Sequence, residues 1–288
     1  MTKWLRTMPV LRGAQRHRHP LKSKAGPLGV PARSRSRLTR GRRACARPVE
    51  RETLLQLSRM PDGEPEIFTS IQGEGISAGT PSVFVRLATC NLRCTWCDTK
   101  YTWDWSQFDP KLEIVALDAR DVADRVRSAR TANVVVTGGE PLLQQRVLGD
   151  LGALLKEDQL RIEVETSGTV VPSGQFADFV DQWNVSPKLA NSHNPVKDRE
   201  IPDALAWFAA HPSAWFKFVV ASHDDVVEAI ALAARYAVPR NRILLMPEGA
   251  DPVTIEERSR WVVEECLRAG VRYSPRLHIQ FWGAERGR

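Results

Sequence analysis

Three of the chain's five cysteines lie within eight residues, in the stretch CNLRCTWC that begins at Cys90. A structural zinc site usually closes around four ligands in two separated pairs, and this stretch offers only three thiols. The other cysteines are Cys45, far upstream, and Cys266, which is expected to be a buried apolar residue on a helix. A cubane iron–sulfur cluster on three thiolates leaves one iron open to a substrate. The spacing therefore favours a [4Fe–4S] cluster held by Cys90, Cys94 and Cys97.

Short runs rich in β-branched and apolar residues alternate with amphipathic segments in the sequence that surrounds these cysteines. Strands are expected at 82–88, 133–139, 161–168, 179–186, 215–220 and 242–249, and helices near 119–130, 145–157, 224–236 and 254–268. This alternation is typical of βα units and a parallel sheet. Six units are fewer than the eight of a closed TIM barrel, so we expect an α/β fold with a partial, open TIM-type barrel of about six βα units.

The carboxyl ends of these expected strands carry the polar residues. They read LATC, TGGEP, ETSG, SPK and MPEG in chain order, and the cysteines follow directly after the first. Because the carboxyl ends of parallel strands meet at one edge of a sheet, these residues are expected to gather around one site.

The N-terminal part of the chain differs in composition from the rest. Residues 1–49 hold 14 of the 41 Lys and Arg and no Asp or Glu, which leaves 27 basic against 34 acidic residues in the remainder. The segment lacks hydrophobic periodicity, so we expect 1–60 to be a disordered basic tail and 61–288 to be the catalytic domain. The tail could bind nucleic acid, act as a transit peptide, or be a leader from a start codon assigned too early. The last is favoured because the regular pattern begins soon after Met60.

The composition also bears on the compartment. The sequence contains no run of 18 apolar residues that would indicate a membrane span, and no secretory h-region. An odd number of cysteines without disulfide-framework spacing indicates a reducing compartment, and a cytoplasmic location is therefore expected.

Two motifs at neighbouring strand ends carry a resemblance to a known superfamily. The first is the cysteine motif of residues 90–97, with an aromatic residue before its third cysteine, and the second is TGGEP at 137–141. Together they resemble the radical S-adenosylmethionine superfamily. The resemblance implies a radical SAM core, with S-adenosyl-L-methionine bound at the open iron.

Further motifs narrow this resemblance. IQGEG (71–75), CDT (97–99), ETSG (165–168) and SPK (186–188) occur in an order similar to that of the 7-carboxy-7-deazaguanine synthase family, over roughly 64–288. That family converts 6-carboxy-5,6,7,8-tetrahydropterin to 7-carboxy-7-deazaguanine by ring contraction with loss of ammonia, in the biosynthesis of queuosine and other 7-deazapurines. The resemblance therefore implies a carbon–nitrogen lyase.

The resemblance also implies roles for single residues, and no catalytic residue beyond the cluster and the cofactor. For S-adenosyl-L-methionine it implies contacts with Trp96, Cys97, Asp98, Gly138, Gly139, Glu140, Ser186, Pro187, Lys188, Met246, Pro247, Glu248 and Gly249. For the pterin it implies contacts with Ile71, Gln72, Gly73, Glu74, Arg86, Thr137, Glu165 and His278. It makes Thr99 a ligand of Mg²⁺, which prefers hard oxygen atoms. Some of these positions also have a simpler interpretation, such as a turn for TGGEP and Thr99, a solvated loop for Gln72 and Glu74, or a terminal strand that packs Phe281 and Trp282 into the core. For Arg86 a simpler interpretation is hard to sustain, because an unpaired buried Arg is costly.

The partners that the resemblance implies are a flavodoxin- or ferredoxin-type electron donor and a second copy of the chain in a homodimer. Nucleic acid is expected to bind only through the basic tail. Two alternative functions stay open at this point: an activating enzyme for a glycyl-radical enzyme of the anaerobic ribonucleotide reductase type, and a non-enzymatic iron–sulfur protein that binds nucleic acid. The non-enzymatic alternative leaves TGGEP and SPK unexplained, whereas the activating enzyme would need an exposed face for a large protein partner, and turnover of the free pterin without a protein partner would discriminate against it.

Overall fold

One sheet runs through residues 53–288, the part of the chain that the computed structural model describes. Its strand order is β10-β9-β8-β7-β6-β5-β3-β1-β4, with β2 paired to β3. The strands are β1 (Leu55–Ser58), β2 (Ile67–Ile71), β3 (Pro81–Leu87), β4 (Ile114–Leu117), β5 (Asn133–Gly138), β6 (Arg161–Thr166), β7 (Gln182–Val185), β8 (Ala214–Val220), β9 (Ile243–Pro247) and β10 (Arg272–Tyr273). From β3 through β5 to β10, neighbouring strands are parallel, whereas β1, β2 and β4 pair antiparallel.

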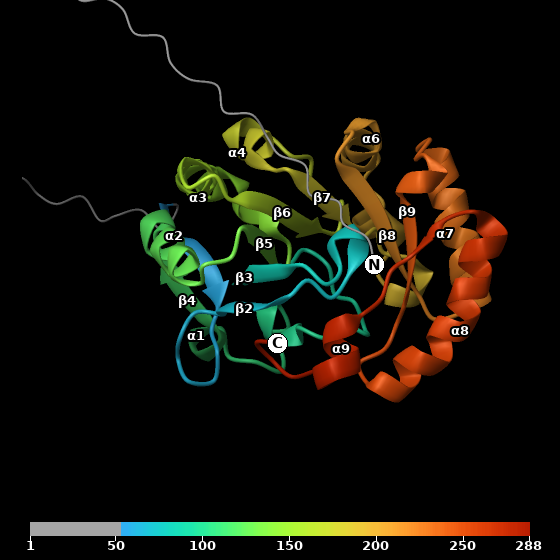
Figure 1. The fold of residues 1–288 in the computed structure, drawn as a ribbon, viewed down its shortest axis with the longest axis horizontal. Coiled ribbons are helices and arrows are strands. Elements are labelled where there is room, and N and C mark those ends of the chain that lie inside the picture. The colour runs from blue at the N-terminus through green and yellow to red at the C-terminus, as the bar shows by residue number, and fades with distance from the viewer. Residues whose placement is uncertain (1–52) are drawn as a thin grey trace, which may run out of the picture. The chain divides into compact units, whose positions relative to one another are not determined.

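Helices connect the parallel strands and cover the outside of the curved sheet (Figure 1). They are α1 (Pro110–Glu113), α2 (Ala119–Ser128), α3 (Gln145–Glu157), α4 (Gly174–Phe179), α5 (Val196–Arg199), α6 (Pro202–Ala210), α7 (His223–Arg235), α8 (Pro252–Ala269) and α9 (Leu277–Trp282). Among the described residues, β4 and β10 end the sheet without pairing to each other, so the barrel is open as expected.

All six expected strands are present, as β3, β5, β6, β7, β8 and β9, and the four expected helices are α2, α3, α7 and α8. Local signals explain why these helices were recognisable. For example, α7 begins with a capping box in which Ser222 accepts from the backbone N–H of Asp225, and the Asp225 side chain accepts from the N–H of Ser222. The helix α6 was missed because it is apolar nearly all round and lacks an amphipathic pattern.

The folded domain begins before the boundary expected after residue 60, and that expectation is wrong. Strand β1 lies between β3 and β4, and the side chains of Leu55 and Leu57 are fully buried (0% exposed). Leu57 pairs with Leu87 of β3 and with Val115 of β4, so β1 joins the two parts of the sheet. Four residues are too short for a clear period-2 pattern, which is why the sequence did not reveal this strand. The expected disordered tail falls almost entirely on residues outside the described range.

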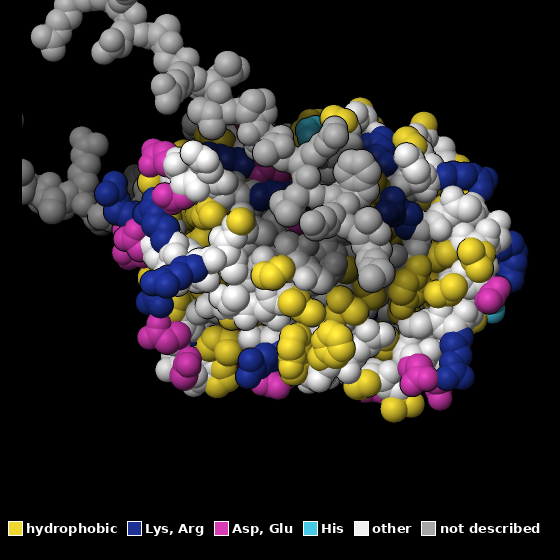
Figure 2. Space-filling view, in the orientation of Figure 1, with side chains coloured by type: hydrophobic (Ala, Val, Ile, Leu, Met, Phe, Trp, Pro, Cys, Tyr) yellow, Lys and Arg dark blue, Asp and Glu magenta, His cyan; other side chains and the backbone are white. Residues whose placement is uncertain are grey.

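The C-terminal segment is helical, so the terminal strand considered for residues 278–282 is wrong. Helix α9 leaves Phe281 and Trp282 62% and 39% exposed, whereas Ile279 is buried. Hydrophobic side chains gather on the face of the molecule over α9 (Figure 2). No helix within residues 53–288 combines the length and apolar character needed to cross a membrane.

Candidate active site

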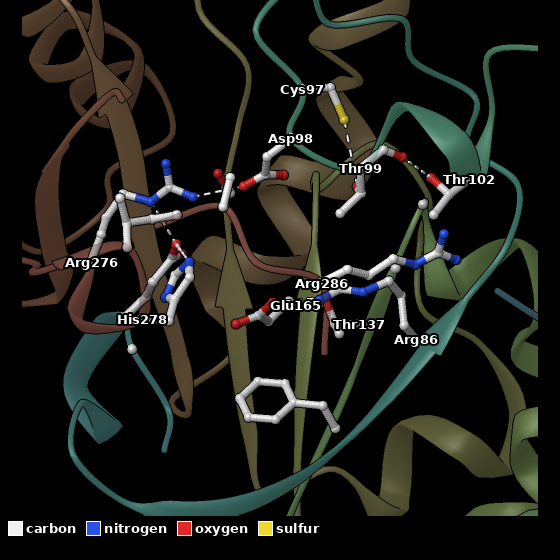
Figure 3. Close-up of a pocket in the computed structure, with 18 of the residues that line it drawn as sticks. Arg86, Cys97, Asp98, Thr99, Thr102, Thr137, Glu165, Arg276, His278 and Arg286 are labelled. Carbon is white, nitrogen blue, oxygen red and sulfur yellow. Dashed lines mark hydrogen bonds and ion pairs between the residues drawn. The ribbon is translucent and has the colours of Figure 1, made fainter. Parts of the chain in front are cut away.

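The carboxyl ends of the parallel strands surround one pocket that holds nearly all of the expected site residues (Figure 3). All eight residues expected for the pterin line it, together with Thr99 and all three clustered cysteines. Arg276 and His278 lie on one side of the pocket, Arg86 and Arg286 lie on the other, and Thr137 and Glu165 lie between them (Figure 3). Residues far apart in the sequence therefore face one space; Ile71 and His278, for example, are 207 positions apart.

The cysteine loop begins directly after β3, and its three thiols are free. Burial raises the pKa of the Cys90 thiol to about 12 and also raises that of Cys94, so neither is a thiolate until a metal displaces its proton. Within residues 53–288, no three His, Cys, Asp or Glu side chains are arranged to hold a single metal ion. An iron–sulfur cluster needs a different arrangement of ligands, because each thiolate binds its own iron. Three cysteines that line one pocket without converging on one point fit a [4Fe–4S] cluster.

The two glycines of the TGGEP motif allow β5 to end against the cysteine loop. Gly138 has φ +133°, and a Cβ atom on Gly139 would lie 1.8 Å from the carbonyl oxygen of Thr89. The N–H of Gly139 donates to the carbonyl of Leu87 at 3.0 Å. No side chain fits at either position, so the two glycines allow the end of β5 to lie close to the residues that lead into the cysteine loop. Both glycines line the pocket.

Glu140 of the same motif has a structural role that the expectation of a cofactor contact did not include. Its carboxylate is fully buried and accepts hydrogen bonds from Leu142 N (3.1 Å), Thr166 Oγ1 (2.8 Å), Ser167 N (2.8 Å) and Ser167 Oγ (2.6 Å). It does not line the pocket. The side chain therefore ties the end of β5 to the end of β6, and any contact of Glu140 with the cofactor would come from its backbone.

The other expected cofactor contacts divide into two groups. Residues that line the pocket are Trp96, Cys97, Asp98, Gly138, Gly139, Ser186, Lys188 and Met246, and those that do not are Glu140, Pro187, Pro247, Glu248 and Gly249. The Lys188 ammonium donates to Ser186 Oγ at 3.1 Å and lies 5.7 Å from the ring centre of Trp96. Glu248 instead pairs with Arg258 of α8, away from the pocket. At the end of β9, only Met246 is placed for the expected contact.

Three of the expected pterin contacts form one hydrogen-bonded group. Glu165 on β6 accepts from Gln72 Nε2 at 3.2 Å through Oε1 and from Thr137 Oγ1 at 2.7 Å through Oε2. The amide oxygen of Gln72 accepts from the N–H of Glu74 at 3.1 Å. This group holds a carboxylate, an amide and a hydroxyl in fixed orientations, which suits a ligand that presents several N–H donors.

Glu74 is surrounded by cationic side chains that the sequence did not associate with it. Its carboxylate pairs with Lys217 of β8 and accepts from Arg276 Nε at 3.0 Å, and His278 Nε2 lies 3.8 Å away. Burial alone would raise the pKa of Glu74, but the attraction of these groups outweighs it and holds the pKa well below its usual range. Burial lowers the pKa of His278 below its usual value.

Arg276 connects three loops that approach the pocket. Besides Glu74 it contacts the cysteine loop, because its Nη2 donates to Asp98 Oδ2 at 2.7 Å. Its Nη1 donates to the carbonyl of Gly249 after β9. The α9 segment is further held by a backbone bond from Leu277 N to Gly73 O at 3.0 Å.

Arg86 stands on β3 beside a second buried carboxylate. Its Nε donates to Glu66 Oε1 at 2.7 Å, and Arg286 from the C-terminal segment donates to Glu66 Oε2 at 3.1 Å. Burial raises the pKa of Tyr101 further above its usual range, so its hydroxyl stays protonated and donates to Glu66 at 3.1 Å. Arg286 also stacks over the Tyr101 ring at 3.6 Å. Glu66 thereby fixes the orientation of Arg86.

Sequence reasoning missed Glu66, Lys217, Arg276 and Arg286. For Lys217 a signal existed, because it is a charge in the middle of the apolar run WFKFVV and such a residue needs a partner. The other three lie in segments without periodicity, so only the fold brings them to the pocket. The expected burial of Cys266 is confirmed.

Comparison with known proteins agrees with this geometry. Residues 85–186 match the family model described as Radical SAM superfamily. The chain is 44% identical over 224 residues to the 7-carboxy-7-deazaguanine synthase of Pyrobaculum aerophilum, covering 77% of this chain and 96% of that protein. It is 35% identical over 227 residues to the enzyme of that name from Hyperthermus butylicus, covering 74% and 90%. The crystal structure of QueE from Escherichia coli is similar with a TM-score of 0.56 and 26% identity, over 76% of this chain and 93% of that one.

Proposed function

Because the chain belongs to the 7-carboxy-7-deazaguanine synthase family of radical SAM enzymes, we propose that it converts 6-carboxy-5,6,7,8-tetrahydropterin to 7-carboxy-7-deazaguanine with loss of ammonia. The observation that carries this proposal is the single pocket, in which every residue expected for the pterin faces the space that the three cysteines border. The alternative of a large protein substrate has no comparable support, and a non-enzymatic protein would not need this pocket.

When bound, the [4Fe–4S] cluster, which Cys90, Cys94 and Cys97 would hold, and S-adenosyl-L-methionine would supply the radical chemistry for removing one hydrogen atom from C6 of the pterin. The chain itself supplies orientation. Arg86, held by Glu66, is placed to bind the substrate carboxylate, for which a guanidinium is well suited because it donates two parallel hydrogen bonds.

Gln72, Glu165 and Thr137 line the pocket as one hydrogen-bonded group, and they accept the N–H groups of the pterin ring. Lys217 and Arg276 each pair with one oxygen atom of the Glu74 carboxylate, so this carboxylate can accept fewer hydrogen bonds from the pterin than expected. Each carboxylate oxygen has a second lone pair, and through these Glu74 accepts one further N–H from the substrate.

Thr99 supplies one hard oxygen ligand to Mg²⁺, which this family uses. Thr99 lines the pocket, and its hydroxyl oxygen lies 3.6 Å from Cys97 Sγ. Mg²⁺ usually keeps several waters and binds through few protein oxygens together with substrate oxygens, so the ion would be held mainly in the substrate complex.

The partners and the location extend the proposal. A low-potential flavodoxin- or ferredoxin-type protein delivers the electron, the enzyme acts as a homodimer, and it works in the cytoplasm, where free thiols stay reduced. Nucleic acid is no partner of the catalytic domain. Size-exclusion chromatography with light scattering tests the dimer, and reduction by purified flavodoxin or ferredoxin tests the donor.

The test of function is anaerobic reconstitution with iron and sulfide, followed by incubation with S-adenosyl-L-methionine, a reductant and the carboxypterin. Mass spectrometry should find 7-carboxy-7-deazaguanine and 5′-deoxyadenosine in the wild type and neither in Cys90→Ala, Cys94→Ala or Cys97→Ala. Cys266→Ala is the matched control, because that buried thiol donates to Arg272 O at 3.3 Å far from the pocket. Cofactor cleavage without turnover of the free pterin would contradict the proposal.

A further inference from the structure

Each sulfur of the three clustered cysteines accepts one N–H group. The pairs are Leu92 N to Cys90 Sγ at 3.4 Å, Asn194 Nδ2 to Cys94 Sγ at 3.3 Å, and Trp103 Nε1 to Cys97 Sγ at 3.3 Å. The first donor is backbone inside the cysteine loop. The other two are side chains, so substitutions can remove them singly.

The orientation of the Asn194 amide follows from its neighbours. Its Oδ1 accepts from the backbone N–H of Arg93 at 2.8 Å, which requires the oxygen to point toward the backbone just before Cys94. The Nδ2 group must then face Cys94 and Ser192, whose Oγ lies 3.2 Å away. Asn194 is buried, so this amide end has no bulk water as an alternative partner.

The Trp103 indole is a donor without any acceptor atom, so its contact with Cys97 can only be N–H to sulfur. The residue follows the short 3-10 turn Lys100–Thr102, where its backbone N–H donates to Lys100 O at 3.0 Å. Thr99 Oγ1 also lies within hydrogen-bond distance of this sulfur, at 3.6 Å, and is a second, longer contact beside the indole N–H. Trp103 and Asn194 thus approach the cysteine loop from two separate segments.

Hydrogen bonds to the sulfur ligands are one of the means by which a protein sets the reduction potential of an iron–sulfur cluster. The reduced cluster carries one more negative charge than the oxidised cluster, so an N–H donor stabilises the reduced form more. We propose that Trp103 and Asn194 are positioning residues that hold Cys97 and Cys94 and raise the reduction potential of the cluster. This inference rests on the proposed function only in requiring the cluster at these three cysteines.

The experiment is an EPR-monitored redox titration of reconstituted Trp103→Phe and Asn194→Ala. Each variant should bind four irons and be harder to reduce, with a three- to tenfold smaller reduction equilibrium constant; tenfold corresponds to about 59 mV for one electron. Matched controls are Trp105→Phe, two residues further along the chain, and Asn91→Ala, whose amide donates to Thr169 Oγ1 at 2.9 Å. Both controls should keep the wild-type potential.

Cofactor cleavage provides a second measurement. With a weak reductant, both variants should form 5′-deoxyadenosine more slowly than the wild type, and a strong low-potential reductant should restore the rate. Wild-type potentials in fully loaded Trp103→Phe and Asn194→Ala overturn the proposal. Failure of the wild type to bind a cluster at all would instead overturn the proposed function.

If a variant loses iron during reconstitution, the wild-type protein can still be used to test the proposal. Pulsed EPR of its reduced cluster, with ¹⁵N in the side chains of Trp or of Asn, should detect a nitrogen coupling from a donor bonded to a cluster sulfur. Absence of the coupling with either label removes that residue from the proposal.

Discussion

Arg276 Nη2 donates to Asp98 Oδ2 at 2.7 Å and so joins the C-terminal segment to the cysteine loop. The same guanidinium donates through Nε to Glu74 at 3.0 Å. The Arg276 side chain therefore holds the loop after β2, the cysteine loop and the C-terminal segment in fixed positions relative to one another. Because Arg276 is only 8% exposed, these bonds are shielded from water.

Replacement of Arg276 by Met should destabilise the protein and impair pterin turnover together. The substitution leaves the buried Glu74 with Lys217 as its remaining cationic pair, and loss of one partner of a buried ion pair costs about 3–5 kcal/mol. Thermal unfolding and steady-state kinetics check this. Arg260→Met is the control, because its pair with Glu256 is exposed on α8 and is worth no more than about 0.5 kcal/mol. Equal melting temperatures of the two variants would show that Arg276 does not organise the pocket.

A protein that starts at Met60 should fold poorly, contrary to what composition suggested for the tail. The truncation deletes β1 with its two fully buried leucines, and each buried leucine contributes about 1.5–3 kcal/mol. It also leaves the pairing edges of β3 and β4 open. A protein that starts at Thr53, after an initiating Met, keeps β1 and should melt close to the full chain. Circular dichroism melts of the two truncations compare them, and identical stability would contradict the role of β1.

The long, regular elements of the fold could be predicted from the sequence because local pattern determines them. The strands β3 and β5 are apolar and β-branched, and the helices α7 and α8 have caps and an amphipathic period. Strand β1 could not be predicted, because four residues carry too little periodicity and its burial depends on partners 30 and 58 positions away, Leu87 and Val115.

For the site, the motifs identified residues whose backbone or chemistry is unusual, such as the cysteines and Gly139. The motifs did not reveal the charged side chains that pair with one another around the pocket. Glu66 and Arg286 meet across 220 positions of sequence, and no local pattern encodes such a pair. Glu140 is the opposite case. Its motif was recognised from the sequence, but the carboxylate joins the end of β5 to the end of β6 instead of facing the cofactor.

Glu74 should make the stability of the protein depend on pH in the acid range. Its pKa in the folded protein lies below the ordinary value of 4.5, so its contribution is fully present above pH 4.5 and is lost as the pH falls through the folded pKa. The contribution is on the order of 2–3 kcal/mol. Wild type should therefore be more stable than Glu74→Gln at pH 7, and the difference should shrink toward pH 3.

Thermal melts at several pH values measure this difference. Glu64→Gln is the control, because Glu64 pairs with Arg125 on the surface and should change stability little at any pH. A difference between wild type and Glu74→Gln that stays constant from pH 7 to pH 3 would show that Glu74 is not the group that titrates.

Thr99 offers the most selective test of the metal's place in the reaction. Thr99→Ala removes one hard oxygen that lies 3.6 Å from Cys97 Sγ at the pocket, but no ligand of the cluster, because the three cysteines are those ligands. Carboxypterin turnover should fall and its magnesium requirement should rise roughly ten- to a hundredfold, the range for loss of a group that supports a metal site. Iron content and uncoupled cleavage of S-adenosyl-L-methionine should persist. Thr99→Ser keeps the hydroxyl and should retain most activity. A wild-type magnesium response in Thr99→Ala would mean that the threonine only shapes the turn that begins at Lys100, and that the ion is held by other atoms.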